Sequence, residues 1–253
     1  MIKKIHYVWL GGAPLPPNVI SCINSWKKNC PEWEIIQWNE NNFDINKYRW
    51  VREAIQLKNY AYAADFIRLF VLKKYGGAYC DTDVQILRPL ENVLDASFVS
   101  GVENHAIGTN ILDEINENGY DKRGKRFSAF CLQAGFMYSE PNHPFIEHCI
   151  QEIYENGNKV LLEKDGKTKV FVIDFEMMVL LQKKYGIKYR DTTQYLDDDI
   201  KIYDSSYFAT RKSKCKESYV IHWFDQSWRN NLGFIFVVKK WIKRNLYFLY
   251  RKI

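Results

Sequence analysis

Residues 59–87, NYAYAADFIRLFVLKKYGGAYCDTDVQIL, decide the fold that the sequence predicts. Apolar residues follow a helical spacing over residues 49–75, and this pattern stops at Gly76-Gly77, a pair suited to left-handed backbone at a helix end. The next ten residues, AYCDTDVQIL, are typical of a β-strand. The stretch therefore predicts a helix, a tight turn and a buried strand in direct succession.

Asp81 and Asp83 lie two residues apart on this expected strand. Because alternate residues of a strand point to the same face, the two carboxylates would converge where the strand leaves the sheet. A hard divalent cation such as Mg²⁺ or Mn²⁺ prefers oxygen ligands and usually binds a few carboxylates together with phosphate oxygens. The pair is thus a candidate site for a metal-bound diphosphate. Two aspartates in an ordinary surface turn have the same spacing.

The rest of the chain alternates strand-like apolar runs with stretches of helical spacing. Further strands are predicted at residues 5–10, 33–38, 98–102, 130–138, 200–203 and 219–223, and further helices at 18–28, 144–154 and 175–184. Strands and helices mixed at this spacing predict an α/β fold around a mostly parallel central sheet. Ligands of such sheets bind at the carboxyl ends of the strands.

The positive charge of the chain is concentrated at its end. The formal net charge is +6, yet residues 226–253 hold seven basic and no acidic side chains, so the remainder is close to −1. A near-neutral body argues against nucleic acid as a partner. A chain of 253 residues that is 47% apolar is long enough for one large domain. We therefore expect a catalytic domain over residues 1–230 and a basic tail over 231–253.

The tail, NLGFIFVVKKWIKRNLYFLYRKI, is too charged to span a bilayer. Its basic residues between positions 239 and 244 would share one arc of a helix, with aromatic and aliphatic residues on another. This pattern predicts an amphipathic helix on an anionic membrane surface, and the alternatives are packing on the body or oligomerisation. Six cysteines without a C-x-x-C pair and an N-terminus without a signal-like apolar run predict a cytoplasmic protein. Together with the tail, this predicts peripheral association with the inner face of the plasma membrane.

The motifs of residues 59–87 resemble glycosyltransferase family 32, a family of DXD-motif sugar transferases. The helix matches the A-x-x-S-D-x-x-R pattern of that family at Ala61, Asp65 and Arg68, with Ala64 in place of the usual serine. Residues 76–83, GGAYCDTD, match its G-G-x-Y-x-D-x-D signature. The resemblance implies a GT-A nucleotide-sugar-binding fold and a reaction that retains the anomeric configuration.

The resemblance extends to three other stretches of the chain. The opening KKIHYVWLGG is similar to the I-P-K-x-I-H-x-x-W start of the family and implies donor contacts for Trp9 and Leu10. The segment QAGFMYSEPNHPF, which has Gln133-Ala134 where Asn-Gly is usual, implies that Gly135 lies against the donor sugar. The segment IHWFDQSW implies that His222, Ser227 and Trp228 lie at the site.

The resemblance implies a role for each of these residues. The catalytic residues it implies are Asp65, Arg68, Asp81 and Asp83. The donor-binding residues it implies are Trp9, Leu10, Asp65, Arg68, Tyr79, Asp81, Gly135, Ser227 and Trp228. The implied ligands of Mn²⁺ or Mg²⁺ are Asp81, Asp83 and His222. The expected reaction moves a hexose from a UDP- or GDP-sugar to a glycan acceptor, in particular a lipid-linked polysaccharide intermediate.

Two other functions remain open at the level of the sequence. A phosphoryl-transfer enzyme would need further carboxylates, for which Asp197-Asp198-Asp199 is a source, although this run is also typical of a solvated turn. A non-catalytic sugar-binding module would keep the fold without the reaction. Residues 104–128, which are polar with scattered glycines, are expected to form a loop over the site that gates substrates.

Overall fold

The computed structural model describes residues 1–107, 111–155 and 172–225. Residues 1–223 form one compact unit, and the second unit, Phe224–Ile253, is described only at its first two residues. The basic tail therefore lies outside the described residues, and the expected boundary near residue 230 stays a prediction. Within the described ranges, no helix is long and apolar enough to cross a membrane.

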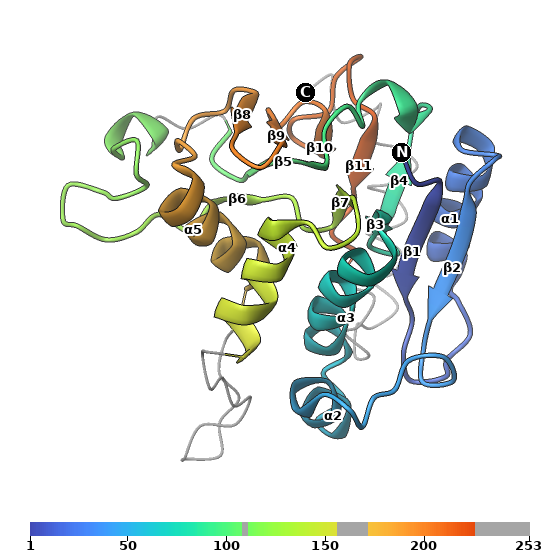
Figure 1. Ribbon diagram of the computed structural model, residues 1–253. Helices are drawn as coiled ribbons and strands as arrows, with labels where there is room; N and C mark the ends of the chain where they lie inside the picture. Colours follow the sequence, from blue (N-terminus) through green and yellow to red (C-terminus); the bar gives the residue numbers. More distant parts are fainter. Residues whose placement is uncertain (108–110, 156–171, 226–253) are drawn as a thin grey trace, which may run out of the picture. The chain divides into compact units, whose positions relative to one another are not determined.

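The described part of the chain alternates strands and helices (Figure 1). The strands are β1 (Lys4–Val8), β2 (Glu34–Trp38), β3 (Gly77–Cys80), β4 (Val84–Ile86), β5 (Phe98–Asn104), β6 (Phe130–Leu132), β7 (Phe136–Ser139), β8 (Gln194–Leu196), β9 (Ile200–Tyr203), β10 (Phe208–Thr210) and β11 (Val220–His222). The helices are α1 (Pro17–Asn29), α2 (Arg49–Gln56), α3 (Tyr60–Tyr75), α4 (Pro144–Cys149) and α5 (Ile173–Tyr185). Short helical turns are η1 (Leu90–Asn92), η2 (Ile111–Glu114) and η3 (Ile150–Glu155).

The central sheet has the strand order β2-β1-β3-β7-β5-β9-β8, with β6 paired to β5 off this path. Strands β2, β1, β3, β5 and β9 run in one direction, and β7 and β8 run against them. The expected α/β fold with a mostly parallel central sheet is confirmed. A second, three-stranded sheet has the order β10-β11-β4.

The central sheet lies between two apolar layers. Helices α2, α3, α4 and α5 contribute to one layer, and α1 contributes to the other together with β4, β10 and β11 (Figure 1). Strand β3 shows how alternation builds both layers, because Tyr79 packs in the first and Ala78 and Cys80 pack in the second. The sheet is thereby covered on both faces, as is usual where most strands are parallel.

The strand predicted for AYCDTDVQIL is interrupted, and that part of the prediction is wrong. Strand β3 ends at Cys80, β4 begins at Val84, and a turn between them is closed by a hydrogen bond of 2.9 Å from the Val84 N–H to the Asp81 carbonyl. The cause is that β3 pairs with β1 and β7 in the central sheet, whereas β4 pairs with β11 in the small sheet. Asp81 and Asp83 converge because of this turn rather than through strand alternation.

Two other predicted elements are also divided. The single helix expected over residues 49–75 is split into α2 and α3 at Lys58, whose φ of 54° lies in the left-handed region and cannot continue a helix. The strand expected over 130–138 is split into β6 and β7, which pair with opposite ends of β5. The strand expected at 200–203 is confirmed with its bounds unchanged, and the helix expected at 144–154 corresponds to α4 followed by η3. The remaining predicted elements are confirmed with shifted ends, whereas β8 and β10 were not predicted.

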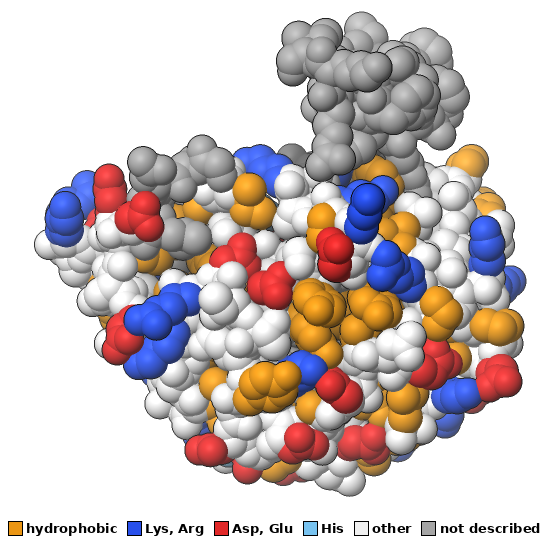
Figure 2. All heavy atoms as spheres, turned by 90° about the horizontal axis from the view of Figure 1, so that it is seen from above, with side chains coloured by type: hydrophobic (Ala, Val, Ile, Leu, Met, Phe, Trp, Pro, Cys, Tyr) orange, Lys and Arg blue, Asp and Glu red, His pale blue; other side chains and the backbone are white. Residues whose placement is uncertain are grey.

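The polar segment 104–128 and the run Asp197–Asp199 can be compared with their predictions. The described parts of 104–128 contain η2 and two isolated bridges, Ile115 to Asp121 and Tyr120 to Arg126, so the gating expected of this segment stays a prediction. The three aspartates form the turn between β8 and β9, as the sequence indicated. On the face of the molecule drawn in Figure 2, basic and acidic side chains are interspersed, in keeping with a near-neutral body.

We expect buried His143 to make folding sensitive to acid. Its Nε2 lies 2.9 Å from the Asp198 carbonyl, and its Nδ1 accepts a hydrogen bond of 3.1 Å from the Phe145 N–H, so the ring is held neutral. Burial lowers the pKa of His143 below its usual value of about 6.5. The unfolded chain then binds the proton first as the pH falls, and stability that is fully present above pH 6.5 is lost below it.

The test compares the free energy of unfolding of the wild type and His143→Gln at pH 7.5 and 5.5. Glutamine does not titrate, so the variant should lose less stability on acidification, by at most about 1.4 kcal/mol, because pH 5.5 lies only one unit below the unfolded pKa of about 6.5. Equal losses in the two proteins would contradict the neutral, buried imidazole.

Candidate functional site

Asp81, Asp83 and His222 form a cluster at the junction of the two sheets. Asp81 and Asp83 occupy the turn after β3, and the pairing of β11 with β4 places His222 opposite Val84. His222 Nε2 lies 3.2 Å from an Asp83 carboxylate oxygen, and the Trp223 N–H donates to the Asp83 carbonyl at 3.1 Å. One ligand atom from each of the three side chains lies within 4.8 Å of the other two.

This donor set suits a hard divalent cation. Opposite ligands of an ion with bonds of about 2.1 Å are separated by about 4.2 Å, so a small inward movement of these side chains would close a coordination sphere. Two carboxylates and one imidazole leave further positions for phosphate oxygens or water, which Mg²⁺ and Mn²⁺ retain in nucleotide sites. The three predicted metal ligands are therefore brought together.

Asp65 and Arg68 lie one turn apart on α3 and face the cluster rather than solvent. Arg68 is 5% exposed, and its Nη2 lies 2.8 Å from an Asp65 oxygen and 3.3 Å from Asp81 Oδ1. Its Nη1 donates a hydrogen bond of 2.7 Å to the Ala134 carbonyl. The guanidinium thus joins α3 to the metal cluster and to the segment before β7.

Asp81 is held by two donors on one of its oxygens. Its Oδ1 accepts from the Tyr79 hydroxyl at 2.9 Å and from Arg68 Nη2 at 3.3 Å, which fixes the orientation of the carboxylate. The Arg68 guanidinium also lies over the Tyr79 ring, 4.9 Å from its centroid. Tyr79 therefore orients both a candidate metal ligand and a candidate phosphate-binding cation.

The electrostatics of the cluster favour an added cation. Burial raises the pKa of Asp65 to about 7 despite the opposing charge of Arg68. Burial also raises the pKa of Asp81, again against Arg68. For His222, burial acts to lower the pKa, but the carboxylates of Asp83 and Glu103 outweigh it and raise this pKa well above its usual range. The carboxylates of Asp83 and Glu103 thus stabilise positive charge at the position of the His222 ring, beside which a cation would bind.

The far side of the His222 ring is lined by Gln133, which the sequence marked only as a departure from the usual Asn-Gly pair, and by Glu103, which was not predicted. His222 Nδ1 lies 3.2 Å from Gln133 Oε1 and 3.7 Å from a carboxylate oxygen of Glu103, which is 3% exposed. Asp174, at the start of α5, was missed as well; burial and the charge of Glu103 raise its pKa well above the usual range. A charged Glu103 within the apolar strand FVSGVEN was the one available signal.

The residues expected to contact the donor fall into three groups. Trp9 directly follows β1, is half-buried, and donates from its indole nitrogen to the Ala13 carbonyl at 2.6 Å. Leu10 is 7% exposed and packs in the core, and Gly135 lies against the His222 ring. Ser227 and Trp228 lie outside the described residues. The donor contacts of these residues stay predictions.

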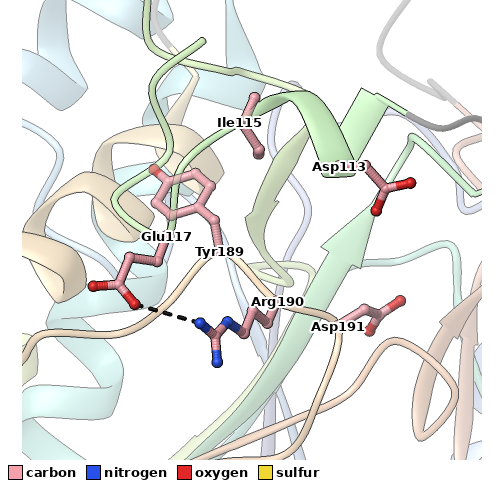
Figure 3. A pocket seen from close by; sticks show the side chains of 6 residues that line it. All are labelled: Asp113, Ile115, Glu117, Tyr189, Arg190 and Asp191. Carbon is pink, nitrogen blue, oxygen red and sulfur yellow. Dashed lines mark hydrogen bonds and ion pairs between the residues drawn. The ribbon is translucent and has the colours of Figure 1, made fainter. Parts of the chain in front are cut away.

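A separate pocket of about 360 Å³ lies beside the segment that follows η2 (Figure 3). Its lining residues are Asp113, Ile115, Glu117, Tyr189, Arg190 and Asp191. Glu117 and Arg190 pair across it at 3.4 Å, and Asp191 accepts a hydrogen bond of 2.9 Å from Asn104, the last residue of β5. None of the three predicted metal ligands lines this pocket.

Comparisons with known proteins agree with the site. Residues 16–99 match the family described as "Glycosyltransferase sugar-binding region containing DXD motif". Subversion of eukaryotic traffic protein A of Legionella pneumophila is 26% identical over 123 residues, which are 38% of this chain and 19% of that protein. Inositol phosphoceramide mannosyltransferase 3 of Schizosaccharomyces pombe is 30% identical over 118 residues, or 42% and 32% of the two chains.

Among solved structures, the PaToxG glycosyltransferase aligns over 72% of this chain and 70% of its own, with 18% identity and a TM-score of 0.45. The chain thus spans less than a third of the length of the two relatives above, and the match centres on the DXD region. The match over residues 16–99 places the DXD region of this chain with those of DXD-motif sugar transferases. Within that class, the predicted resemblance to glycosyltransferase family 32 is confirmed.

We expect Asp83→Asn to abolish divalent-cation binding and to lower cation-dependent turnover of a nucleotide sugar at least a hundredfold, about 2.7 kcal/mol in transition-state free energy. The substitution keeps the size of the side chain but removes the charge that faces His222 Nε2. The matched control is Asp95→Asn. It neutralises an aspartate whose Oδ2 lies 2.7 Å from Nζ of Lys201, a residue of β9. Turnover by Asp83→Asn close to that of Asp95→Asn would show that the cluster has been misassigned.

Proposed function

We propose that this chain transfers a hexose from a nucleotide-diphosphate sugar to a glycan acceptor in a reaction that depends on Mn²⁺ or Mg²⁺. The observation that carries the proposal is the convergence of Asp81, Asp83 and His222 beside a buried arginine. The family match over residues 16–99 supports sugar transfer rather than phosphoryl transfer. Among the described residues, the carboxylates of Asp197–Asp199 are not part of the cluster.

The chemistry requires stabilisation of the nucleoside diphosphate that leaves as the anomeric bond breaks. A divalent cation held by Asp81, Asp83 and His222 would neutralise charge that develops on this leaving group. Arg68 is fixed by Asp65 and Asp81, so its positive charge is already in place before the donor binds. Asp65 keeps a carboxyl group beside it that can bind donor hydroxyls. Retention of configuration follows from the resemblance to family 32.

The nucleoside would lie at the carboxyl ends of β1 and β3, which are neighbouring parallel strands. Trp9 follows β1 and Asp81 follows β3, so an aromatic ring and the metal cluster lie at the same edge of the sheet. A stacked base is worth about 1–3 kcal/mol of binding energy, and the Trp9 indole is held by its hydrogen bond to Ala13. We therefore assign Trp9 to the donor base.

The wild-type protein should be stabilised by one nucleotide sugar out of a panel of UDP-, GDP- and CDP-sugars, and only when Mn²⁺ is present. A ligand that binds the folded state alone, at about 100 times its dissociation constant, adds about 2.7 kcal/mol to the free energy of unfolding. The measurement is the shift in unfolding temperature for each nucleotide sugar, with and without Mn²⁺. The rate of hydrolysis of the stabilising donor is then measured. Stabilisation without hydrolysis would favour a sugar-binding module, and no response to any donor would refute the proposal.

For the acceptor, we propose a lipid-linked glycan at an anionic membrane surface, reached from the cytoplasmic side. One relative is named as a mannosyltransferase of inositol phosphoceramide, which is a lipid. The basic and aromatic composition of residues 231–253 also supports a membrane partner, because basic residues near an anionic surface contribute about 1 kcal/mol each. The same composition would place the enzyme at the inner face of the plasma membrane.

Full-length protein should sediment with anionic vesicles at low salt. Replacing Lys239, Lys240 and Lys243 with glutamine should weaken this binding by about 3 kcal/mol, or roughly a hundredfold, because three charges are lost. The matched control replaces Lys183, Lys184 and Lys188 in and after α5 with glutamine, which removes the same charge from the body. Equal binding by the two triple variants, or by none of the proteins, would contradict a role for the tail.

A further inference from the structure

The side of the His222 ring that faces away from Asp83 is held by Gln133. The Gly135 N–H lies 3.2 Å from Gln133 Oε1 in hydrogen-bonding geometry. An N–H can only donate, so this contact identifies the atom as the amide oxygen and not the amide nitrogen. The same oxygen lies 3.2 Å from His222 Nδ1.

The protonation of the His222 ring follows from these contacts. An amide oxygen can only accept, so Nδ1 of His222 must carry the hydrogen that lies between the ring and Gln133. The second neighbour of Nδ1 is a carboxylate oxygen of Glu103 at 3.7 Å, which is also an acceptor. Nε2 faces the Asp83 carboxylate, so in the charged ring it carries a hydrogen as well. A cation that binds Nε2 would displace that hydrogen and leave the one on Nδ1, where both neighbours are acceptors.

Gln133 is rigidly placed for this task. Its side chain is fully buried between β6 and β7, its backbone N–H donates to the Gly101 carbonyl at 2.8 Å, and its own carbonyl accepts from Ser100 Oγ at 3.0 Å. Gly135 allows the close approach, because a Cβ at that position would come within 3.0 Å of both Gln133 Oε1 and His222 Nδ1. The backbone of Gln133 is thus fixed on both sides and its Oε1 is held by the Gly135 N–H, while its buried amide nitrogen has no hydrogen-bond partner among the described residues.

We propose that Gln133 is a positioning residue for the cation site: it holds His222 with the proton on Nδ1 and the lone pair of Nε2 directed at the position shared with Asp81 and Asp83. Outer partners of this kind fix the ring orientation of a ligating histidine, and their loss typically costs ten- to a hundredfold in metal affinity. The inference rests on the proposed function in one respect, which is that the cluster binds a divalent cation.

The test measures Mn²⁺ affinity from the electron paramagnetic resonance signal of the free ion, without nucleotide or acceptor. Gln133→Met keeps the length of the side chain but removes the acceptor, and its affinity should be ten- to a hundredfold weaker than that of the wild type. Gln133→Glu retains an acceptor at the same position and should bind Mn²⁺ at least as well as the wild type. The control is Gln194→Met, which removes a glutamine hydrogen-bonded to the backbone of Lys188 at two points.

A second measurement needs no variant. The ¹⁵N chemical shifts of the His222 ring in the Mg²⁺-loaded wild type should show hydrogen on Nδ1 and none on Nε2, and a hydrogen on Nε2 would overturn the proposal. Wild-type Mn²⁺ affinity in Gln133→Met would also overturn it, with the metal-dependent function intact. No Mn²⁺ binding by the wild type would refute the metal-dependent function and the positioning role together.

Discussion

The site depends on one constraint, which is that the chain leaves the central sheet after β3 and enters the small sheet at β4. Main-chain pairing on both sides of the turn fixes its ends, so Asp81 and Asp83 have little freedom in where they point. The pairing of β4 with β11 also brings His222, which is 139 residues after Asp83 in the chain, to the same place. The metal cluster is thus a product of sheet topology more than of local sequence.

Around this junction the protein keeps several ionisable groups out of water. Such burial is costly, and it is offset here by mutual contacts: Arg68 neutralises part of the charge of Asp65 and Asp81 while it donates to a backbone carbonyl. The arrangement fixes charges before any ligand arrives, which is how an electrostatic site avoids reorganisation during a reaction. The buried charges that prepare this site for a ligand therefore lower the free energy of unfolding of the protein.

Much of the architecture could be predicted from local pattern, because α1, α5, β2 and β9 have apolar spacing that agrees with their surroundings. The turn between β3 and β4 could not, since the apolar run AYCDTDVQIL gives no sign that its two halves join different sheets. Motif resemblance supplied Asp81, Asp83 and His222. The resemblance missed Glu103 and marked Gln133 only as a departure from the usual Asn-Gly pair. Both residues act through contact with His222, which is 119 and 89 residues away in the chain.

The small sheet is built from three strands of only three residues each, β4, β10 and β11. So short a pairing is weakly specified by its own hydrogen bonds, and a slip of one residue would carry an apolar side chain to the place of His222. A cation bound by residues from both sides of the β4–β11 pair would make such a slip costly. Metal binding and the native strand register then stabilise each other. A cation that binds only the native register shifts the equilibrium away from slipped pairings of β4 and β11.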